Sequence, residues 1–526
     1  MFKRVLPLFV LVLVPALAWT DSATQPASKP PALILRISSL DNLFDQLDLI
    51  GSITDQKNIG KELNDHFKNK LGPKGLFAID AKRPIAFYGA IPTDGMDLPG
   101  VLMLPVTGDK AFKEMLEALG WEVAAEKGGL NIVKQDFVTG DLQYRIAANY
   151  AYIGVVGQSK LDDLPKPEAI FNAKRQASVS ATIKLDQIPE VLRGQMLDGF
   201  KEGFNSGLDK KTESNAQKAF ANAVLKEFTG MLDSVFKEGE ELNVNIDIDP
   251  KTKKLAAELT LTAKPRSKLA DTIAKLGQRK TLFAGIMDKD AAMNGLLNFD
   301  MPASLRDAVS GMLQEAVDKA LADLRDDVKK KQTTELFDAL KPSLTAEDLD
   351  VGFSLRGPGK DKHFTLVAGF KLRQGDKLLA TLMKLINDLP ENERNNIKLF
   401  ADKAGNVAIH RLDLQKTLDA NVKEMFGEHP LFVAFRDDAL FVSMGEDGLA
   451  VIKQAVTSQA KVAAPLQFDM SITRLASVLD KNPAAAKELQ DAGDDGRIQL
   501  TLEGGQLLRA RATLSLSAFK LFGQEK

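Results

Sequence analysis

The feature that most constrains the fold is a strand–turn–strand–helix unit between Leu242 and Leu276. Apolar residues alternate with polar ones in two runs, first at Val244, Ile246 and Ile248 and then at Ala257, Leu259 and Leu261. This period of two predicts two strands, each with one apolar face. The five residues from Asp249 to Lys253, DPKTK, are typical of a hairpin turn. After Pro265 the apolar residues change to a helical spacing, so a helix is expected to follow the hairpin.

The order of a strand, helices, a hairpin and a helix occurs four times along the chain. The copies begin at Ala32, Ala177, Thr281 and Pro465. The first copy predicts a helix that Asp109 caps. In the third copy, the sequence predicts the opening strand in TLFAGIM from Thr281 and one long helix from Ala303 to about Leu340. One hairpin alone would bury too little apolar surface to offset the entropy of ordering it, so the copies are expected to share sheets covered by helices.

Additional strands separate copies one and two, and corresponding strands separate copies three and four. The run from Ala151 to Gly157 parallels the run from Ala439 to Gly445, and a short helix with Leu161 or Leu449 is expected after each. We interpret this as a tandem duplication of about 250 residues, a longer period than that of the solenoid repeats. The predicted fold class is therefore α+β, with two related lobes, residues 32–278 and 279–526, each a largely antiparallel sheet with helices packed on one face.

The N-terminus has the pattern of a secretory signal. Lys3 and Arg4 precede an apolar run from Val5 to Leu17, and Ala16-Leu17-Ala18 fits a cleavage site, which predicts a signal peptide over residues 1–18. Residues 19–31 are rich in Pro, Ser and Ala, and they are expected to form a disordered tether. The apolar run is shorter than the ~20 residues of a membrane-spanning helix, and the remaining sequence predicts no integral membrane segment. An exported protein, periplasmic or extracellular and soluble after cleavage near Ala18, is expected.

Composition excludes several classes of partner and site. The chain has no cysteine, which excludes thiolate nucleophiles and cysteine-ligated metals. Its net charge of -2 argues against a nucleic-acid partner. The run of lysines from Lys329 to Lys331 is interpreted as a solvated helix end. Neither a cofactor nor a metal ion is predicted.

Residues that could act as nucleophiles or metal ligands occur in the sequence without the partner residues that such sites need. The four histidines, His66, His363, His410 and His429, have no metal-ligand spacing. Three S-x-x-K matches begin at Ser234, Ser458 and Ser517, but their companion motifs are absent. Gly357-Pro358-Gly359 is interpreted as a tight turn, because the glycine spacing of a phosphate loop is missing. No catalytic, cofactor-binding or metal-binding residue is therefore assigned.

Acidic residues leave one catalytic alternative open. The paired acids are Asp94 with Asp97, Asp247 with Asp249, Asp437 with Asp438 and Asp494 with Asp495. None fits a calcium loop, and turn formation explains most of them. A carboxylate-dependent hydrolase needs no sequence adjacency, so it is predicted only if two carboxylates converge in one cleft.

The segments ALILRIS, RPIAFYGAI, PGVLMLPVTGDKAFKEMLEALG, GGLNIV and YAYIGVVGQSKLDDL occur in a recognisable order. In this order the chain resembles large exported bacterial proteins of unknown function that carry strand–helix–hairpin–helix repeats. The resemblance covers most of the mature chain, contains no diagnostic motif and implies an exported, non-catalytic protein.

Three functions follow from these observations. The first hypothesis is an exported non-catalytic protein that binds an envelope or extracellular protein partner. The alternative is a periplasmic carrier of a lipid or another apolar ligand, held between the helices and the sheet. The second alternative is the carboxylate-dependent hydrolase.

Overall fold

The structure is a computed structural model, and it describes most of the chain in eight segments and four isolated residues. The described residues are 31–53, 58–91, 100–135, 140–171, 177–208, 214–414, 418–476, 478, 487, 489, 496–516 and 518. The predicted signal peptide and nearly all of the predicted tether therefore lie outside the described residues, as do Asp94, Asp97, Asp494, Asp495 and Ser517. Among the described helices, none has both the length and the apolar content that crossing a membrane requires.

Contacts divide the described residues into two compact units. Unit one contains the residues up to Asp198 and those from Asp233 to Leu269. Unit two contains Gly199 to Leu232 and the residues from Ala270 onward. The predicted boundary near residue 278 stays a prediction.

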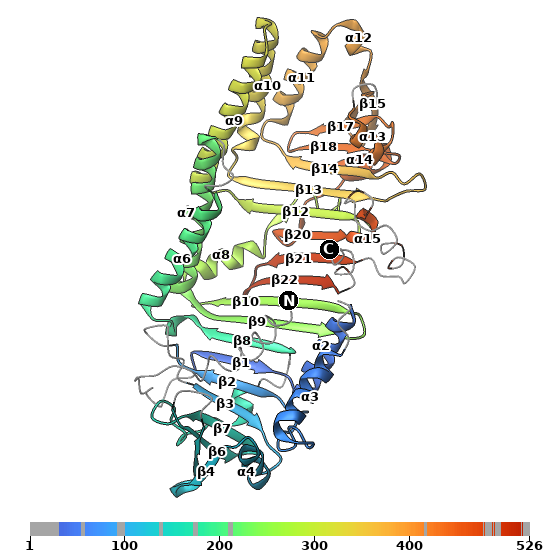
Figure 1. The fold of residues 1–526 in the computed structure, drawn as a ribbon. Helices are drawn as coiled ribbons and strands as arrows, with labels where there is room; N and C mark the ends of the chain where they lie inside the picture. The colour runs from blue at the N-terminus through green and yellow to red at the C-terminus, as the bar shows by residue number, and fades with distance from the viewer. Residues whose placement is uncertain are drawn as a thin grey trace. The chain divides into compact units, whose positions relative to one another are not determined.

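Unit one contains a ten-stranded sheet among its described residues, with strand order β4-β5-β6-β7-β3-β2-β1-β8-β9-β10 (Figure 1). Every neighbouring pair is antiparallel. The strands are β1 (Leu33–Ile37), β2 (Ile85–Gly89), β3 (Gly100–Pro105), β4 (Glu122–Ala125), β5 (Leu130–Lys134), β6 (Leu142–Ala147), β7 (Tyr150–Val155), β8 (Val179–Lys184), β9 (Gly239–Asp249) and β10 (Lys254–Ala263). The helices are α2 (Leu40–Ile53), α3 (Ile59–Leu71), α4 (Asp109–Ala118) and α5 (Pro167–Ile170), together with parts of α6 (Glu190–Leu208), α7 (Asn215–Glu238) and α8 (Lys268–Leu276).

Unit two contains a second ten-stranded antiparallel sheet, with order β15-β16-β17-β18-β14-β13-β12-β20-β21-β22, and the small pair β11–β19. The strands are β11 (Lys280–Thr281), β12 (Met293–Asp300), β13 (Asp348–Arg356), β14 (Thr365–Lys371), β15 (Ile397–Ala404), β16 (Val407–Leu412), β17 (Leu431–Arg436), β18 (Ala439–Met444), β19 (Lys461–Val462), β20 (Leu466–Ser471), β21 (Arg497–Glu503) and β22 (Leu508–Ser515). The helices that lie wholly in this unit are α9 (Ala303–Asp323), α10 (Asp327–Leu344), α11 (Gly375–Asn387), α12 (Glu391–Arg394), α13 (Ala420–Phe426), α14 (Gly448–Val456) and α15 (Ile472–Leu475).

The two sheets have the same strand order. When β1 is matched with β12, each following strand of unit one has a counterpart at the same place in unit two, through to β10 and β22. The predicted α+β class with antiparallel sheets is confirmed. The shared order is what a tandem duplication would produce, and the duplication itself stays a prediction.

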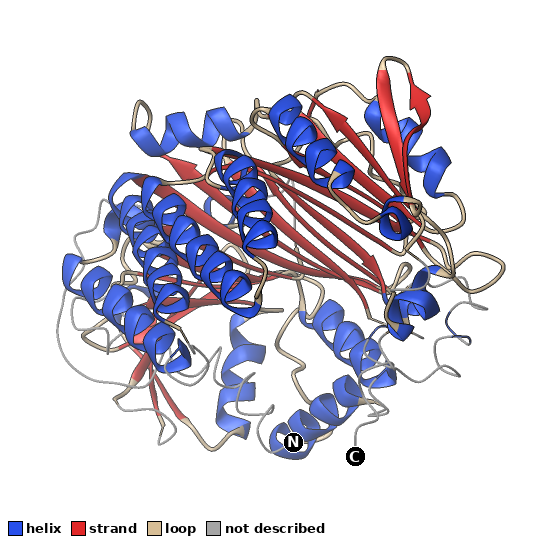
Figure 2. Ribbon diagram, turned by 90° about the horizontal axis from the view of Figure 1, so that it is seen from above, coloured by secondary structure: helices blue, strands red, loops and turns tan. Residues whose placement is uncertain are grey.

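Helices lie beside the layer of strands (Figure 2). In unit two, α14 packs on one face of the sheet with Phe441, whereas α10 and α11 pack on the other face with Leu440. These neighbours of β18 point to opposite faces because successive strand side chains alternate. The helical cover in unit two therefore extends beyond the single layer that the sequence predicts.

Four local predictions differ from the structure. Asp109 does not cap the helix of the first copy, because it is the first residue of α4 and the N-cap is Gly108. The segment TLFAGIM does not form the opening strand of the third copy, because only Lys280 and Thr281 form the short β11 and the sheet strand is β12, twelve residues later. The predicted long helix is two helices, since Leu324 leaves the helix with extended angles and the Asp326 side chain caps α10 by accepting from the Val328 and Lys329 amides. The lysine run therefore lies in the first turns of α10. Leu161 is not in a helix, although its counterpart Leu449 is in α14.

Candidate functional site: an open apolar sheet face

One face of the second sheet is lined with apolar side chains that no helix fully covers. In strands β12, β13, β20 and β21 the residues on this face are all apolar. We call it the apolar face of unit two, and it consists of Leu297, Phe299, Val351, Phe353, Leu466, Phe468, Leu500 and Leu502. Each of these side chains keeps solvent-exposed surface. The exposed fraction reaches 37% at Leu297 and 39% at Leu500.

Strand register explains how these residues form one surface. Residues directly opposite each other in antiparallel strands point to the same face. Leu466 pairs with Leu297 on one side and with Leu502 on the other, and Phe468 pairs with Leu500. The alternating sequence of each strand therefore adds one row of aliphatic or phenyl groups to a continuous face.

Four strands of unit one, three of which are counterparts of β12, β20 and β21, carry a similar surface. The apolar face of unit one consists of Leu33, Leu35, Ala181, Ile183, Leu242, Val244, Ile246 and Leu259 on β1, β8, β9 and β10. It contains three of the six alternating apolar residues of the predicted hairpin, Val244, Ile246 and Leu259. The strands are as predicted, but Ile246 and Leu259 are 41% and 36% exposed. The alternation of apolar and polar residues predicted which residues share this face. It did not predict that some of them remain exposed to solvent.

Backbone groups of these strands are not available to a partner chain in unit two. β20 is hydrogen-bonded to β12 and β21, and β21 is hydrogen-bonded to β20 and β22. An added strand needs an unpaired strand edge. The apolar face can therefore offer only its side chains, and these contain no hydrogen-bond donor or acceptor.

The histidines do not form a metal site. Among the described residues, no three His, Asp or Glu side chains lie close enough together to hold a metal ion. His66 is exposed on α3. Side-chain atoms of His363 and His429 both lie 3.0 Å from the point where a Cβ on Gly427 would be, a proximity that their spacing in the sequence did not indicate.

His410 is buried between Phe400 and Phe435, with ring centroids 5.3 Å and 6.1 Å away. Its Nδ1 accepts from the Phe400 amide at 3.3 Å, and its Nε2 has no partner among the described residues. Burial lowers the pKa of His410, because it disfavours the imidazolium form.

His410 should therefore make stability depend on pH. Unfolded chains protonate this histidine below a pH of about 6.5, whereas the folded protein resists protonation to lower pH. The free energy of unfolding should fall as the pH drops below this value, and His410→Phe should flatten that fall. Urea unfolding between pH 7.5 and 5 measures the effect, with His66→Gln as a control that changes an exposed histidine. An unchanged slope in His410→Phe would contradict the assignment.

The described S-x-x-K serines have structural contacts. The Ser458 hydroxyl donates to the Leu282 carbonyl at 3.2 Å, and Ser234 lies in α7, where Lys237 pairs with Asp233 at 2.8 Å. Gly357-Pro358-Gly359 lies in the connection between β13 and β14 and contains a cis peptide bond before Pro358.

The described acidic pairs lie at turns or strand ends. Asp249 accepts from the Lys251 amide at 2.8 Å and from the Thr252 amide at 3.3 Å, and these bonds lower the pKa of Asp249. Asp247 accepts from the Ser178 hydroxyl. Asp438 pairs with Arg436 beside the turn between β17 and β18. None of these pairs faces the apolar surfaces.

Carboxylates do converge elsewhere, at a polar pocket of unit two that sequence reasoning missed. Asp288, Asp469 and Glu503 line it. Each is ion-paired with an arginine, at 3.4 Å from Arg356, 2.7 Å from Arg497 and 3.8 Å from Arg509 respectively. The residues come from segments more than 170 positions apart, so only the strand order could have indicated the site. The hydrolase stays a prediction.

Comparisons with known proteins gave one match, to a solved structure. No protein-family model and no curated protein matches it. One solved structure, titled "Structure of crystal form IV of TP0453", is 11% identical. The alignment covers 48% of this chain and 86% of that one, with a TM-score of 0.23. A similarity at this level carries no inference about fold or function.

Proposed function

We propose that the protein is an exported, non-catalytic binding protein whose apolar sheet faces hold the acyl chains of lipids. The observation that supports this function is the open apolar face of unit two, on which Leu297 of β12 and Leu500 of β21 are the most exposed residues. Contiguous apolar surface that stays exposed typically marks a site of interaction. The equivalent face of unit one offers a second surface of the same chemistry.

The chemistry of the face favours an alkyl chain over a protein surface. Protein interfaces have about one hydrogen bond per 100–200 Å², and a polar group buried without a partner costs free energy. The side chains of this face can form no such bond, and the strand backbones are already paired. An alkyl chain needs no hydrogen bond and gains ~0.8 kcal/mol for each buried methylene.

Binding of palmitate, measured by calorimetry, tests this function. Leu500→Glu puts a charge on the apolar face beside Phe468, where desolvation opposes ligand burial. Because Leu500 is already partly exposed, folding should tolerate the change. We expect palmitate to bind at least ten times more weakly to Leu500→Glu than to the unchanged protein.

The matched control is Val328→Glu on α10, a residue that is 63% exposed and lies outside the face. This variant should bind palmitate normally. Absence of palmitate binding by the unchanged protein, or equal weakening in both variants, would contradict the proposal. Native mass spectrometry of the protein purified from its own envelope should also show bound lipid.

A protein partner is the second candidate, and helix side chains favour it. Met231 on α7 and Met312 on α9 are 49% and 37% exposed. Methionines adapt to varied surfaces and are frequent where proteins bind several partners. Cross-linking in envelope extract, compared between the unchanged protein and Met231→Glu, tests this candidate, and identical cross-linked products would remove its support.

A further inference from the structure

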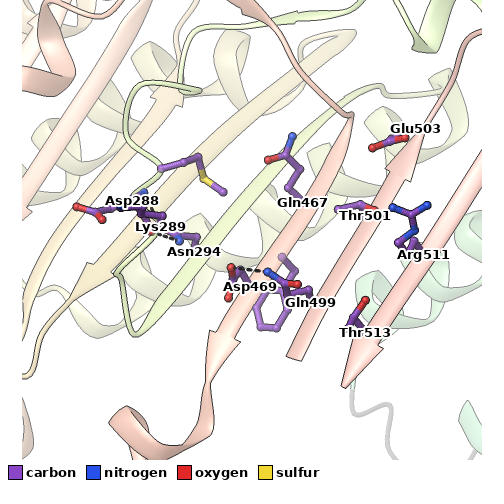
Figure 3. A pocket seen from close by; sticks show the side chains of 12 residues that line it. Asp288, Lys289, Asn294, Gln467, Asp469, Gln499, Thr501, Glu503, Arg511 and Thr513 are labelled. Atoms are coloured by element: carbon purple, nitrogen blue, oxygen red, sulfur yellow. Dashed lines mark hydrogen bonds between the residues drawn. The ribbon is translucent and has the colours of Figure 1, made fainter. Parts of the chain in front are cut away.

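A polar pocket lies on the face of β20, β21 and β22 opposite the apolar face of unit two (Figure 3). Its volume is about 440 Å³, within the range of small-molecule sites. Gln467, Gln499, Thr501, Arg511 and Thr513 line it from the strands, and Lys289 lines it from the segment before β12. The pocket lies wholly within unit two.

Strand register builds the floor of the pocket. Gln467 pairs with Thr501, which pairs with Arg511, and Gln499 pairs with Thr513. These residues alternate with the apolar residues of the same strands, so they form two polar rows on the other face. Figure 3 shows the labelled side chains of these rows beside one another.

The segment that carries Lys289 is held in place by a buried asparagine. Asn294 on β12, 3% exposed, donates to the Asp288 carbonyl at 2.6 Å and accepts from the Asp288 amide at 3.2 Å. Arg356 also pairs with the Asp288 carboxylate. One wall of the pocket is therefore fixed before any ligand arrives, which lowers the entropic cost of binding.

Several lining groups can still form hydrogen bonds. Within the described part of the chain, the side chains of Gln467, Thr501 and Thr513 make no hydrogen bond with the protein. The Gln499 amide nitrogen donates to Asp469 at 3.1 Å, which leaves its carbonyl oxygen facing the pocket side of the sheet. Carboxamides and hydroxyls both donate and accept, as the hydroxyls of a polyol do.

Unit one provides an internal comparison. On β1, β8 and β9, the counterparts of β12, β20 and β21, Arg36 donates to Thr182 at 2.8 Å, Thr182 donates to Asn243 at 2.7 Å, and Asn243 donates to Glu241 at 2.7 Å. These polar side chains satisfy one another. The equivalent face of unit two instead keeps its carboxamides and hydroxyls open, so sheet stability alone does not require them.

The charges of the pocket favour an anion. The three lining carboxylates each pair with an arginine that lies outside the lining. Among the described residues Lys289 makes no ion pair, so it gives the lining a positive charge that no carboxylate of the protein neutralises. Lys289 is exposed and lies beside Asp288, on the side of the pocket away from Arg511 and Thr513 (Figure 3).

The geometry points to a binding site for a polyol that carries one anionic group, such as a sugar acid or a glycerol phosphate. The carboxamides and hydroxyls of β20, β21 and β22 bind its hydroxyls, and Lys289 binds its anionic group. This site is separate from the proposed acyl-chain surface and does not depend on it.

Saturation-transfer NMR and calorimetry on the full chain test the site. The probes are D-glucuronate, sn-glycerol 3-phosphate, the neutral sugar D-glucose and acetate, which lacks hydroxyls. We expect glucuronate or glycerol phosphate to bind at least ten times more tightly than glucose and acetate. Glucuronate as the tighter probe identifies a carboxylate sugar, and glycerol phosphate as the tighter probe identifies a phosphate head group or its free form.

Two variants in the pocket test where the ligand binds, and two variants outside the pocket are controls. Thr501→Val removes one hydroxyl and Lys289→Gln removes the positive charge, and each should weaken binding of the preferred probe at least fivefold. Thr260→Val on β10 and Lys254→Gln change residues outside the pocket and should leave binding unchanged. Absence of binding by either anion, equal binding of glucose, or equal effects of pocket and control variants would overturn the inference.

Discussion

Phe283→Ala should lower the free energy of unfolding by about 3–5 kcal/mol, the usual cost of deleting a fully buried phenyl group. Phe283 has no exposed surface, and its ring lies over Gly352 and Gly369, which pair in register on β13 and β14. It also meets Phe441 edge to face, with centroids 5.7 Å apart. A Cβ at either glycine would collide with Phe283, so the two positions form a recess for this ring. Alanine would leave that recess empty, because the strands beneath cannot close it.

Urea unfolding followed by circular dichroism measures this loss. Phe400→Ala is the matched control, because Phe400 is also in unit two but 63% exposed, and its loss should be below about 1 kcal/mol. Phe283→Leu should fall between the two, since leucine refills part of the recess. If Phe283→Ala lost no more unfolding free energy than Phe400→Ala, the prediction that Phe283 stabilises the core of unit two would be wrong.

Period-two alternation predicted the strands well and also the faces to which they belong. The rows of Leu242, Val244 and Ile246 and of Leu259 lie on β9 and β10 as expected. Alternation fails for TLFAGIM, where apolar residues follow one another around Gly285. Phe283 and Ile286 of this segment enter the core from an irregular backbone, and glycines on two other strands provide the space. The fit between Phe283 and these glycines involves residues about 70–90 positions apart, so a local sequence pattern cannot predict it.

Sequence reasoning was less informative about the candidate sites. It interpreted alternating apolar residues as buried, whereas Leu297 and Leu500 are 37% and 39% exposed. The polar pocket combines residues near position 289 with residues near 467 and 500. Gln467, Thr501 and Thr513 belong to no motif. Their common face follows only from the pairing of β20 with β21 and of β21 with β22.

The two units have the same strand order, but the polar side chains on their sheets make different contacts. In unit one, Arg36, Thr182 and Asn243 bond to one another, whereas in unit two the corresponding face borders a pocket. If one block was duplicated, the apolar faces are the feature that both copies kept. A shared apolar surface with a pocket on one copy is consistent with two binding activities on one scaffold, each of which the variants above can remove separately.

Asp350→Ala should lower the free energy of unfolding by about 3 kcal/mol. Asp350 is 3% exposed on β13, where one oxygen accepts from the Thr281 hydroxyl at 2.7 Å and the other from the Leu282 amide at 2.8 Å. These bonds fasten the residues immediately before Phe283 to the sheet. Without the carboxylate, both buried donors lose their acceptor, and each unsatisfied donor costs about 1–3 kcal/mol.

Asp350→Asn separates the charge of this group from its hydrogen bonds. The amide oxygen can accept from Leu282, and the Thr281 hydroxyl can rotate to accept from the new NH₂ group. The asparagine variant should therefore lose much less stability than the alanine variant, on the order of 1 kcal/mol. Equal losses in the two variants would show that the carboxylate does not anchor the segment.

Burial raises the pKa of Asp350, an effect that its hydrogen bonds to Leu282 and Thr281 only partly offset. The folded protein therefore holds this proton to a higher pH than the unfolded chain does, whose aspartates titrate near pH 3.9. As the pH rises from about 4 through the raised pKa, the unfolded chain releases the proton first, and the contribution of Asp350 to stability declines. Asp350→Asn has no proton to lose at this position. Its free energy of unfolding should therefore rise relative to that of the unchanged protein across this interval, and at higher pH the difference between the two should be constant. Urea unfolding of both proteins from pH 3.5 to 8 measures the difference, and a constant difference throughout would show that the buried carboxyl does not titrate as its environment requires.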